Sequence, residues 1–559
     1  MKWFLFVLIV IISGCANQTA PTGGPKDSEP PKLLTSNPEN KSTNVKTQEI
    51  ELVFDEYVKL NKAEEQIIIS PQTEIEKKFK TKKEKVYIEF EQQLPDSTTY
   101  TINFREGVQD ITEGNSPLDL KLAFSTGNYM DSLFIEGAVK DILTDKPGNN
   151  YSIFLYDALD TLTIFEDKPL YFTKANDKGL YKLENIKNGQ YLIYAVADKN
   201  KNLKLDFDDE SYGFIDSTIQ LDSSVTDLNI LTTSTNAKPL ALKSARQNGT
   251  IFEVKYNKYT INYSIINSDS IQLYSNYTDN TQTSIQVFNN NILVDSTESY
   301  IFATDSLGVE SVDTVMVKFE ETVRKPKDFE SKVTLEKIYP TDGILKGIID
   351  FNKPIYQFNF DSVYLFLDSL NIIKLDTSNF LKANHYADAF ELEYVIDKNL
   401  FESKENEQTQ TTQTRSDTVR RTPPPKPHLY IGKGAFISVD QDSVQQQQSK
   451  LTFTELSTTG TLLIEINTDK PNYIVQLLSP NFQLIQEKRN TKLFSFNKVN
   501  PGEYFIRVLI DTNQNGRWDP GNINQTIMPE PVIFYTNEEG DKKLTIRANW
   551  ELGPNVITF

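Results

Sequence analysis

The sequence predicts an all-β protein, built from tandem β-sandwiches behind a signal segment and a flexible stalk. Short runs rich in Val, Ile, Tyr, Phe and Thr alternate apolar and polar residues, and clusters of Asn, Asp, Gly and Pro separate them. These runs are EIELVF (49–54), KVYIEF (85–90), TYTINF (99–104), QYLIYAV (190–196), TVMVKF (314–319), TLLIEI (461–466) and EYFIRVLI (503–510). Their regular spacing indicates antiparallel sheets packed on one face, with few helices.

The N-terminus, MKWFLFVLIVIISGC, is typical of a bacterial lipoprotein signal. Lys2 supplies the positive charge, and Phe4 to Ile12 form an apolar run too short to cross a bilayer. Residues 12–15 match a lipobox, so we expect residues 1–14 to be removed and Cys15, the single cysteine of the chain, to be acylated. The alternative is an ordinary secretory signal with an incidental cysteine.

Residues 15–31 are rich in Pro, Gly and small polar residues, which predicts a lipidated, flexible stalk. No later apolar stretch approaches the ~20 residues of a membrane-spanning helix, so attachment to the membrane would depend on the lipid alone.

An internal repeat organises the remainder of the chain. Residues 180–206 match residues 493–519 without a gap, and a fainter echo links 51–60 with 347–356. A two-domain unit would then occur twice, on either side of a separate β-domain. The predicted domains are 32–130, 131–235, 236–330, 331–455 with a disordered insertion at 402–427, and 456–559. The glutamines at 445–448 and His428 are expected in loops.

Charge and histidine content limit the function. The net charge of −19 repels phosphate backbones, so nucleic acid is not an expected partner. His385 and His428 are the two histidines, and this scarcity argues against most acid–base catalysis at neutral pH. Asp55 and Glu56 are adjacent carboxylates, but neighbours on a strand point to opposite faces and cannot flank one bond. The sequence predicts a non-enzymatic protein.

Several motifs resemble a family of Bacteroidota outer-membrane lipoproteins. The motifs are PTGGPKD (21–27), IELVFDEYVKL (50–60), AFSTG (123–127), EGAVKD (136–141) and NGQYLIYAVADKNKNLKLD (188–206). The resemblance covers residues 12 to about 215 and, less closely, 456–559. It implies an SbsA-type Ig-like β-sandwich at 32–130, and carboxypeptidase-regulatory or transthyretin-like β-sandwiches at 131–235 and 456–559. It also implies an outer-membrane lipoprotein of a Gram-negative bacterium. The resemblance assigns no catalysed reaction and no catalytic residues.

The residues after Cys15 bear on which side of the membrane the protein occupies. Ala16 departs from the Asp that retains lipoproteins at an inner membrane, and Lys26, Asp27 and Glu29 resemble the charged export tag of surface lipoproteins in this phylum. The resemblance therefore favours the cell surface over the periplasmic face.

Two loops carry oxygen ligands at identical spacing. Positions 1, 3, 5 and 9 are Asp198, Asn200, Asn202 and Asp206 in the first loop, and Asp511, Asn513, Asn515 and Asp519 in the second. Hard oxygen donors at this spacing suit Ca²⁺, and Gly516 at position 6 of the second loop permits a sharp turn. Position 12 lacks the Glu of an EF-hand. A structural Ca²⁺ site and a metal-free, Asx-rich turn both remain open.

The first hypothesis for function is a scaffold or accessory subunit of an outer-membrane protein complex that inserts or exports proteins or takes up nutrients. It would be held to the membrane by its lipid and would contact an integral β-barrel protein or other lipoproteins. A second hypothesis is a surface glycan-binding or adhesive protein with a solvent-facing row of aromatic side chains. A third is a carboxylate-dependent glycosidase within 236–455. Most of the 26 Tyr and 33 Phe are expected in cores.

Overall fold

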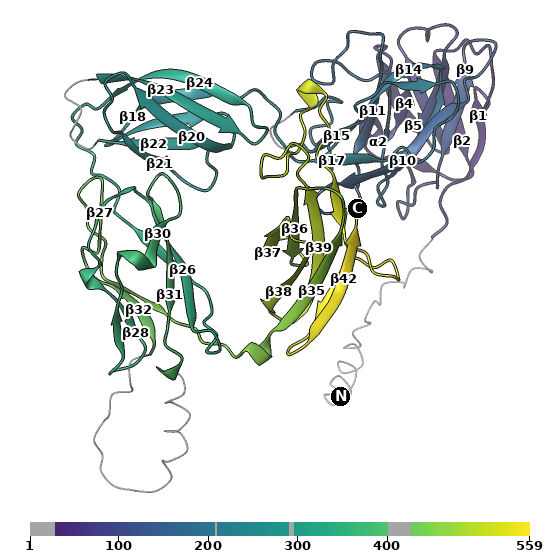
Figure 1. The fold of residues 1–559 in the computed structure, drawn as a ribbon. Coiled ribbons are helices and arrows are strands. Elements are labelled where there is room, and N and C mark those ends of the chain that lie inside the picture. The colour runs from purple at the N-terminus through teal and green to yellow at the C-terminus, as the bar shows by residue number, and fades with distance from the viewer. Residues whose placement is uncertain (1–27, 207–209, 290–295, 401–425) are drawn as a thin grey trace, which may run out of the picture. The chain divides into compact units, whose positions relative to one another are not determined.

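The computed structural model describes residues 28–206, 210–289, 296–400 and 426–559 (Figure 1). Cys15, its signal and most of the predicted insertion lie outside these residues. The prediction of an all-β fold is confirmed: strands dominate, and helical structure in the described ranges is confined to short segments such as α2 (Ala63–Gln66). No helix in these ranges is long and apolar enough to span a membrane.

The chain divides into two compact units, each described by itself below. Among the described residues, unit 1 comprises 28–141, 146–206 and 210–232, and unit 2 comprises 142–145 and those from 233 onward. Unit 1 holds two sandwiches, and unit 2 holds three.

The first sandwich buries alternate residues of its strands. Ile50, Leu52 and Phe54 of β2 pack inward against Val86 and Ile88 of β6, while the intervening side chains face outward. Its larger sheet is β1 (Leu33–Asn37), β2 (Glu49–Phe54), β6 (Lys85–Phe90) and β5 (Lys77–Lys82). The other two are β4 (Ile68–Ser70), β7 (Thr99–Asn103) and β9 (Lys121–Ser125), and the pair β3 (Val58–Leu60) and β8 (Val108–Asp110).

The second sandwich forms one hydrogen-bonded path of strands around a core that includes Ile135, Leu155 and Ile193. The strands run in the order β12 (Tyr171–Lys174), β11 (Ser152–Asp157), β14 (Gly189–Val196), β15 (Tyr212–Phe214), β17 (Ile230–Thr233), β10 (Leu133–Asp141) and β13 (Leu180–Ile186), with β16 (Ile219–Leu221) on β14. Its first strand, β10, pairs in parallel with its last, β17.

The fifth sandwich repeats most of these strand pairings, but its strands form two separate sheets instead of one continuous path. Its strands are β35 (Gly460–Asn467), β36 (Tyr473–Leu478), β37 (Leu484–Arg489), β38 (Leu493–Val499), β39 (Gly502–Ile510), β40 (Val532–Phe534), β41 (Lys543–Ile546) and β42 (Glu551–Thr558). Again the first strand pairs in parallel with the last, β42, and in antiparallel fashion with β38, the counterpart of β13. Both β14 and β39 pair with three antiparallel strands, one before them in the chain and two after.

The third and fourth sandwiches lie between the repeats. The third consists of β18 (Leu242–Asn248), β19 (Ile251–Tyr256), β22 (Ser284–Phe288) and β21 (Tyr274–Tyr277), facing β20 (Thr260–Asn267), β23 (Ser296–Asp305) and β24 (Glu310–Lys318). The fourth contains β25 (Ser331–Leu335), β26 (Ile344–Phe351), β31 (Ala389–Val395) and β30 (Phe380–Lys382), the sheet β29 (Ile372–Lys374), β28 (Val363–Phe366), β32 (His428–Ile431) and β34 (Gln447–Lys450), and the pair β27 (Ile355–Phe358) and β33 (Phe436–Ser438).

Two loop predictions in the fourth sandwich are wrong. His428 begins β32, and Gln447 and Gln448 lie in β34. These strands pair along their whole length, from His428 opposite Lys450 to Ile431 opposite Gln447. Cross-strand pairing on a half-buried sheet has overridden the weak β-propensity of glutamine.

Candidate functional site

The first Asx loop joins β14 to β15 and closes on itself through side-chain hydrogen bonds. Asp198 accepts from the backbone N–H groups of Asn202 (3.1 Å) and Leu203 (3.2 Å). The Asp206 carboxylate accepts from the Nδ2 groups of Asn200 (2.5 Å) and Asn202 (2.8 Å). The four predicted ligands are therefore brought together.

The second Asx loop has the same bonds at equivalent positions. Asp511 accepts from the N–H groups of Asn515 (3.0 Å) and Gly516 (2.9 Å). Asn513 and Asn515 donate through Nδ2 to Asp519, at 2.5 and 2.6 Å. Equal sequence spacing has produced equal geometry in both repeats.

Sequence reasoning missed a buried glutamate behind each loop. Glu210 accepts from the N–H groups of Lys199 (2.9 Å) and Asp206 (2.8 Å), and Glu530 accepts from those of Thr512 (2.6 Å) and Asp519 (2.9 Å). Each glutamate thus accepts hydrogen bonds from both ends of its loop: from the residue after the first aspartate and from the last aspartate. The recurrence was hidden because Glu210 follows Asp198 closely, whereas a longer excursion separates Glu530 from Asp511.

The loops satisfy most of their own polar groups, although the buried Asp519 Oδ1 accepts no hydrogen bond and has only an ion pair with Arg517 Nε at 3.0 Å. The oxygens of these side chains also suit an oxygen-liganded cation. Burial raises the pKa of Asp198 and of Glu210, because desolvation penalises the charged carboxylates. A divalent cation would offset that penalty, and carboxylate and amide oxygens are the donors that Ca²⁺ takes. Within the described ranges, no group of three or more His, Cys, Asp or Glu side chains is arranged to hold a metal ion. Ca²⁺ in these loops stays a prediction.

Aromatic side chains lie mostly in cores, but four project from the outer face of the sheet containing β28 and β32. Phe366 and His428 stack face to face, with ring centroids 4.8 Å apart and planes 3° apart. Tyr364 and Tyr430 contact the Phe366 ring at 6.3 and 6.0 Å. Because Phe366 and His428 stack on each other, one face of each ring is covered. The cluster therefore does not form the solvent-facing row of aromatic rings that the glycan-binding hypothesis predicts.

The third and fourth sandwiches are joined by a tyrosine that crosses from one to the other. Tyr386, in the loop between β30 and β31, packs against the core of the third sandwich. Its ring stacks on Tyr263 with centroids 4.6 Å apart and contacts Tyr277 at 5.5 Å. Its hydroxyl donates to Asn262 Oδ1 (3.1 Å) and accepts from the Tyr263 N–H (3.3 Å).

A belt of polar contacts reinforces this joint. Asn276 Nδ2 donates to the Asp388 carboxylate at 2.9 Å, and Gln286 Nε2 donates to the Asn352 carbonyl at 3.0 Å. Asn276 and Gln286 are buried and also bond to each other at 2.8 Å. Buried amides that are hydrogen-bonded across the joint in this way favour one arrangement of the two sandwiches.

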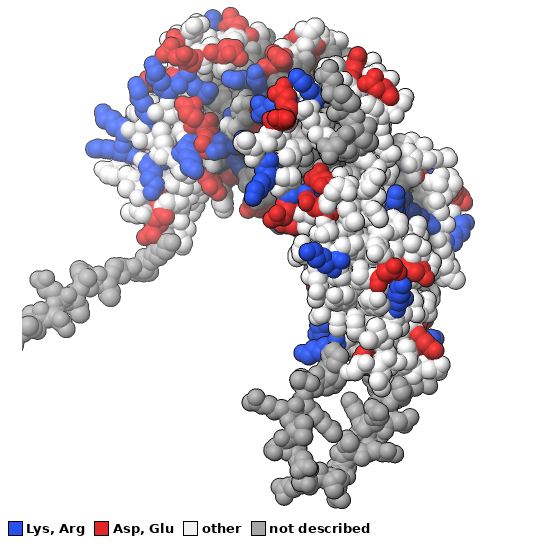
Figure 2. Space-filling view, turned by 90° about the vertical axis from the view of Figure 1, so that its left-hand side faces the viewer, with Lys and Arg blue, Asp and Glu red and all other residues white. Residues whose placement is uncertain are grey.

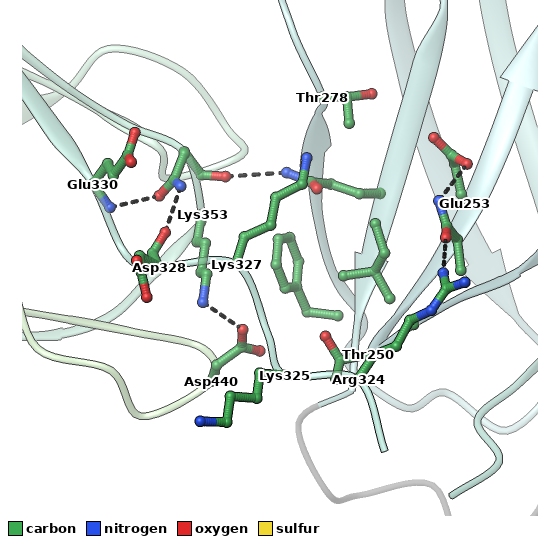
Figure 3. A pocket seen from close by; sticks show the side chains of 16 residues that line it. Thr250, Glu253, Thr278, Arg324, Lys325, Lys327, Asp328, Glu330, Lys353 and Asp440 are labelled. Carbon is green, nitrogen blue, oxygen red and sulfur yellow. Dashed lines mark hydrogen bonds and ion pairs between the residues drawn. The ribbon is translucent and has the colours of Figure 1, made fainter. Parts of the chain in front are cut away.

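Beside the joint lies a polar pocket of about 570 Å³ (Figure 3). The turn between β18 and β19, the connector around Arg324 to Glu330, and the fourth sandwich near Lys353 form its walls. Figure 3 shows Asp328, Glu330 and Lys353 on one side and Arg324 and Glu253 on the other.

Two of the charged groups in the pocket walls, Lys353 and Glu253, are held in place by hydrogen bonds. Lys353 is buried and donates to Asp440 (2.8 Å) and Asp442 (2.7 Å). Burial alone would lower the Lys353 pKa, but the two carboxylates raise it above its ordinary value. Burial alone would likewise raise the pKa of Glu253, but bonds from Lys255, Ser284 and Asn248 hold it below its ordinary value.

Asp55, Trp518 and His385 each make a structural contact. Asp55 follows the end of β2 and accepts from the Lys32 N–H at 2.7 Å, which is a loop-capping contact. Trp518 donates from Nε1 to the Glu530 carbonyl at 2.8 Å and so ties the second Asx loop to the segment before β40. His385 lies next to Tyr386 at the joint, with Nε2 3.3 Å from the Tyr263 carbonyl.

Comparison with protein families supports an Ig-like first sandwich. Residues 27–126 match the model of the bacterial Ig-like domain. A search of curated proteins found no match.

Solved structures give distant matches. The major pilin subunit BcpA of Bacillus cereus is 9% identical with a TM-score of 0.13, over 77% of this chain and 98% of that chain. Surface layer protein SbsC, domains 1–6, is 10% identical with a TM-score of 0.14, over 92% of this chain and 67% of that chain. A putative carbohydrate-binding protein from Bacteroides uniformis is 11% identical with a TM-score of 0.11, over 34% of this chain and 99% of that chain. At these TM-scores the matches carry no argument about function.

Proposed function

We propose that this protein is a non-enzymatic, lipid-anchored arm that serves as a scaffold or accessory subunit of an outer-membrane protein complex. The observation that carries the proposal is the locked joint between the third and fourth sandwiches. Tyr386 inserts into a core that is not its own, and a buried amide belt lies beside it. Adjacent domains move relative to one another by default, so a joint of this kind indicates that a fixed geometry is useful.

Unit 1 supports the same proposal because its two sandwiches are also bridged by side chains. Ser70 Oγ donates to the Phe172 carbonyl at 3.0 Å, and Asn185 Nδ2 donates to Thr101 Oγ1 at 2.6 Å. The bond from Ser70 is buried, so water does not compete with it.

The membrane part of the proposal is supported by the sequence. The signal before Cys15, the family resemblance and the residues after Cys15 together favour a lipid-anchored protein of the outer membrane, on the cell surface. The proposed partners are an integral β-barrel protein or other lipoproteins. Lys and Arg are interspersed with Asp and Glu on the face drawn in Figure 2, as suits protein contacts better than nucleic acid.

Native purification tests the proposal. The lipoprotein is extracted in mild detergent after brief cross-linking, and co-purifying chains are identified by mass spectrometry. We expect a stable complex with an integral outer-membrane protein. The Cys15→Ser variant is the control, and it should lose both the membrane fraction and the complex. Recovery of the acylated protein as a lone monomer would contradict the proposal.

A second candidate function, adhesion to a surface glycan, is favoured by the polar pocket beside the joint. Its walls are dense in hydrogen-bonding side chains, in contrast to the mostly apolar walls of pockets for drug-like ligands. A glycan array probed with the full-length protein tests this function separately from co-purification.

A further inference from the structure

We propose that the pocket between the third and fourth sandwiches is a binding site for a short, electrically neutral oligosaccharide. This inference rests on the second candidate function, since it names the site and the ligand class for glycan adhesion. It needs no catalytic step, because the pocket would only bind.

Charge balance in the pocket selects against ions. Its lining includes four cationic side chains (Arg324, Lys325, Lys327 and Lys353) and four acidic ones (Glu253, Asp328, Glu330 and Asp440). A singly charged ligand would therefore gain from one set and be repelled by the other. In a chain of net charge −19, a balanced pocket is a local departure from the overall excess of acid.

Hydrogen-bonding side chains that have no protein partner suit a polyol. In the described part of the chain, the exposed side chains of Lys325, Lys327, Asp328 and Glu330 make no hydrogen bond or ion pair with protein groups, so a ligand can bond to them by displacing water. The lysines can only donate and the carboxylates can only accept. A sugar hydroxyl does both, so an uncharged ligand can bond to either kind of group.

The pocket is also shaped in advance of binding. Lys353, held by two aspartates, and Gln286, held by the amide belt, form fixed parts of its lining. Rigid walls reduce the conformational entropy that is lost when a ligand binds. The volume of about 570 Å³ lies within the usual range for small-molecule sites and leaves room for a short chain of sugar rings.

The test uses the full-length protein in detergent and a panel of neutral and acidic oligosaccharides. Binding is read on an array and then by ligand-observed NMR with the strongest neutral binder. The site variants are Lys327→Met and the double change Asp328→Ala with Glu330→Ala. The matched controls are Lys382→Met and Glu391→Ala, which alter exposed residues of the fourth sandwich outside the pocket lining. Thermal unfolding checks that all variants fold.

We expect a neutral oligosaccharide to bind, the site variants to lose roughly tenfold or more in affinity, and the controls to match the unchanged protein. Binding that survives both site variants would overturn the assignment of the site while leaving glycan adhesion in place. Binding of acidic glycans or peptides alone would overturn the ligand class. No binding to any glycan at millimolar concentration would remove the inference and the second candidate together, but not the scaffold proposal.

Discussion

Replacing Tyr386 by alanine should uncouple the third and fourth sandwiches. The substitution removes the stack on Tyr263, the edge contact with Tyr277 and two hydrogen bonds of the hydroxyl. Truncating a fully buried aromatic side chain costs about 3–5 kcal/mol, and Tyr386 is only half-buried. We therefore expect a loss of about 2–4 kcal/mol, including about 1 kcal/mol for each hydrogen bond.

This loss belongs to the contact between sandwiches, not to the core of the fourth sandwich itself. Calorimetry should show that the unfolding transitions of the two sandwiches separate, and small-angle scattering should show a broader distribution of interatomic distances. Tyr386→Phe keeps the ring contacts and should lose only about 1–2 kcal/mol, without uncoupling.

Tyr364→Ala is the matched control, because its ring contacts Phe366 and Tyr430 within the fourth sandwich and does not reach the third. It should lower stability without changing the scattering profile. If Tyr386→Ala gave the same scattering profile as Tyr364→Ala, the reasoning about the joint, and with it the main support for a stiff scaffold, would be refuted.

Three further predictions concern polar groups. Ca²⁺ should stabilise the folded protein by about 2.7 kcal/mol at a hundredfold excess over Kd, and so raise the midpoint of thermal unfolding. Mg²⁺ should raise the midpoint much less, and Asp519→Ala should reduce the effect of Ca²⁺. If Ca²⁺ left the midpoint unchanged, the metal-free turn would be favoured. Burial alone would raise the pKa of Asp110, but hydrogen bonds from three backbone N–H groups hold it at about 2. Asp110→Asn should therefore lower the free energy of unfolding in urea by about 2 kcal/mol at pH 7. Since the pKa is depressed in the folded state, this difference should vanish as pH falls from about 4 towards 2, and a pH-independent difference would contradict this account. Lys353→Met should destabilise by about 3–5 kcal/mol by stranding Asp440, and adding Asp440→Asn should restore much of the loss.

Much of the fold could be predicted because the signal is local. In KVYIEF the alternation places Val86, Ile88 and Phe90 in the core, as β6 shows. The constant spacing of the repeat likewise predicted equal geometry in the two Asx loops, because a hydrogen-bonded turn is determined by residues close together in sequence.

The features that were missed depend on contacts between distant residues. Tyr386 and Tyr263 are hydrogen-bonded but lie 123 residues apart in the sequence. The residues around each tyrosine give no sign that it belongs to a contact between domains. The pocket likewise takes its walls from several separate stretches of the chain, from Asn248 to Asp440. Glu210 and Glu530 gave a usable signal, an acid shortly before the next strand in both repeats, but the unequal distance from the first aspartate concealed it.

The first Asx loop connects local turn chemistry to the arrangement of domains. Lys201, at its tip, forms an ion pair with Glu65 of α2 in the first sandwich. This contact lowers the pKa of Glu65, but the pair is partly exposed, so it contributes little stability by itself. The strength of the ion pair depends on how firmly the loop holds Lys201 in position. Glu210 contributes to this because it accepts hydrogen bonds from the N–H groups of Lys199 and Asp206 in the same loop. A residue such as Glu210 can thus affect the joint of unit 1 without touching the first sandwich, and Glu210→Gln should weaken the Lys201–Glu65 coupling measured in a double-mutant cycle.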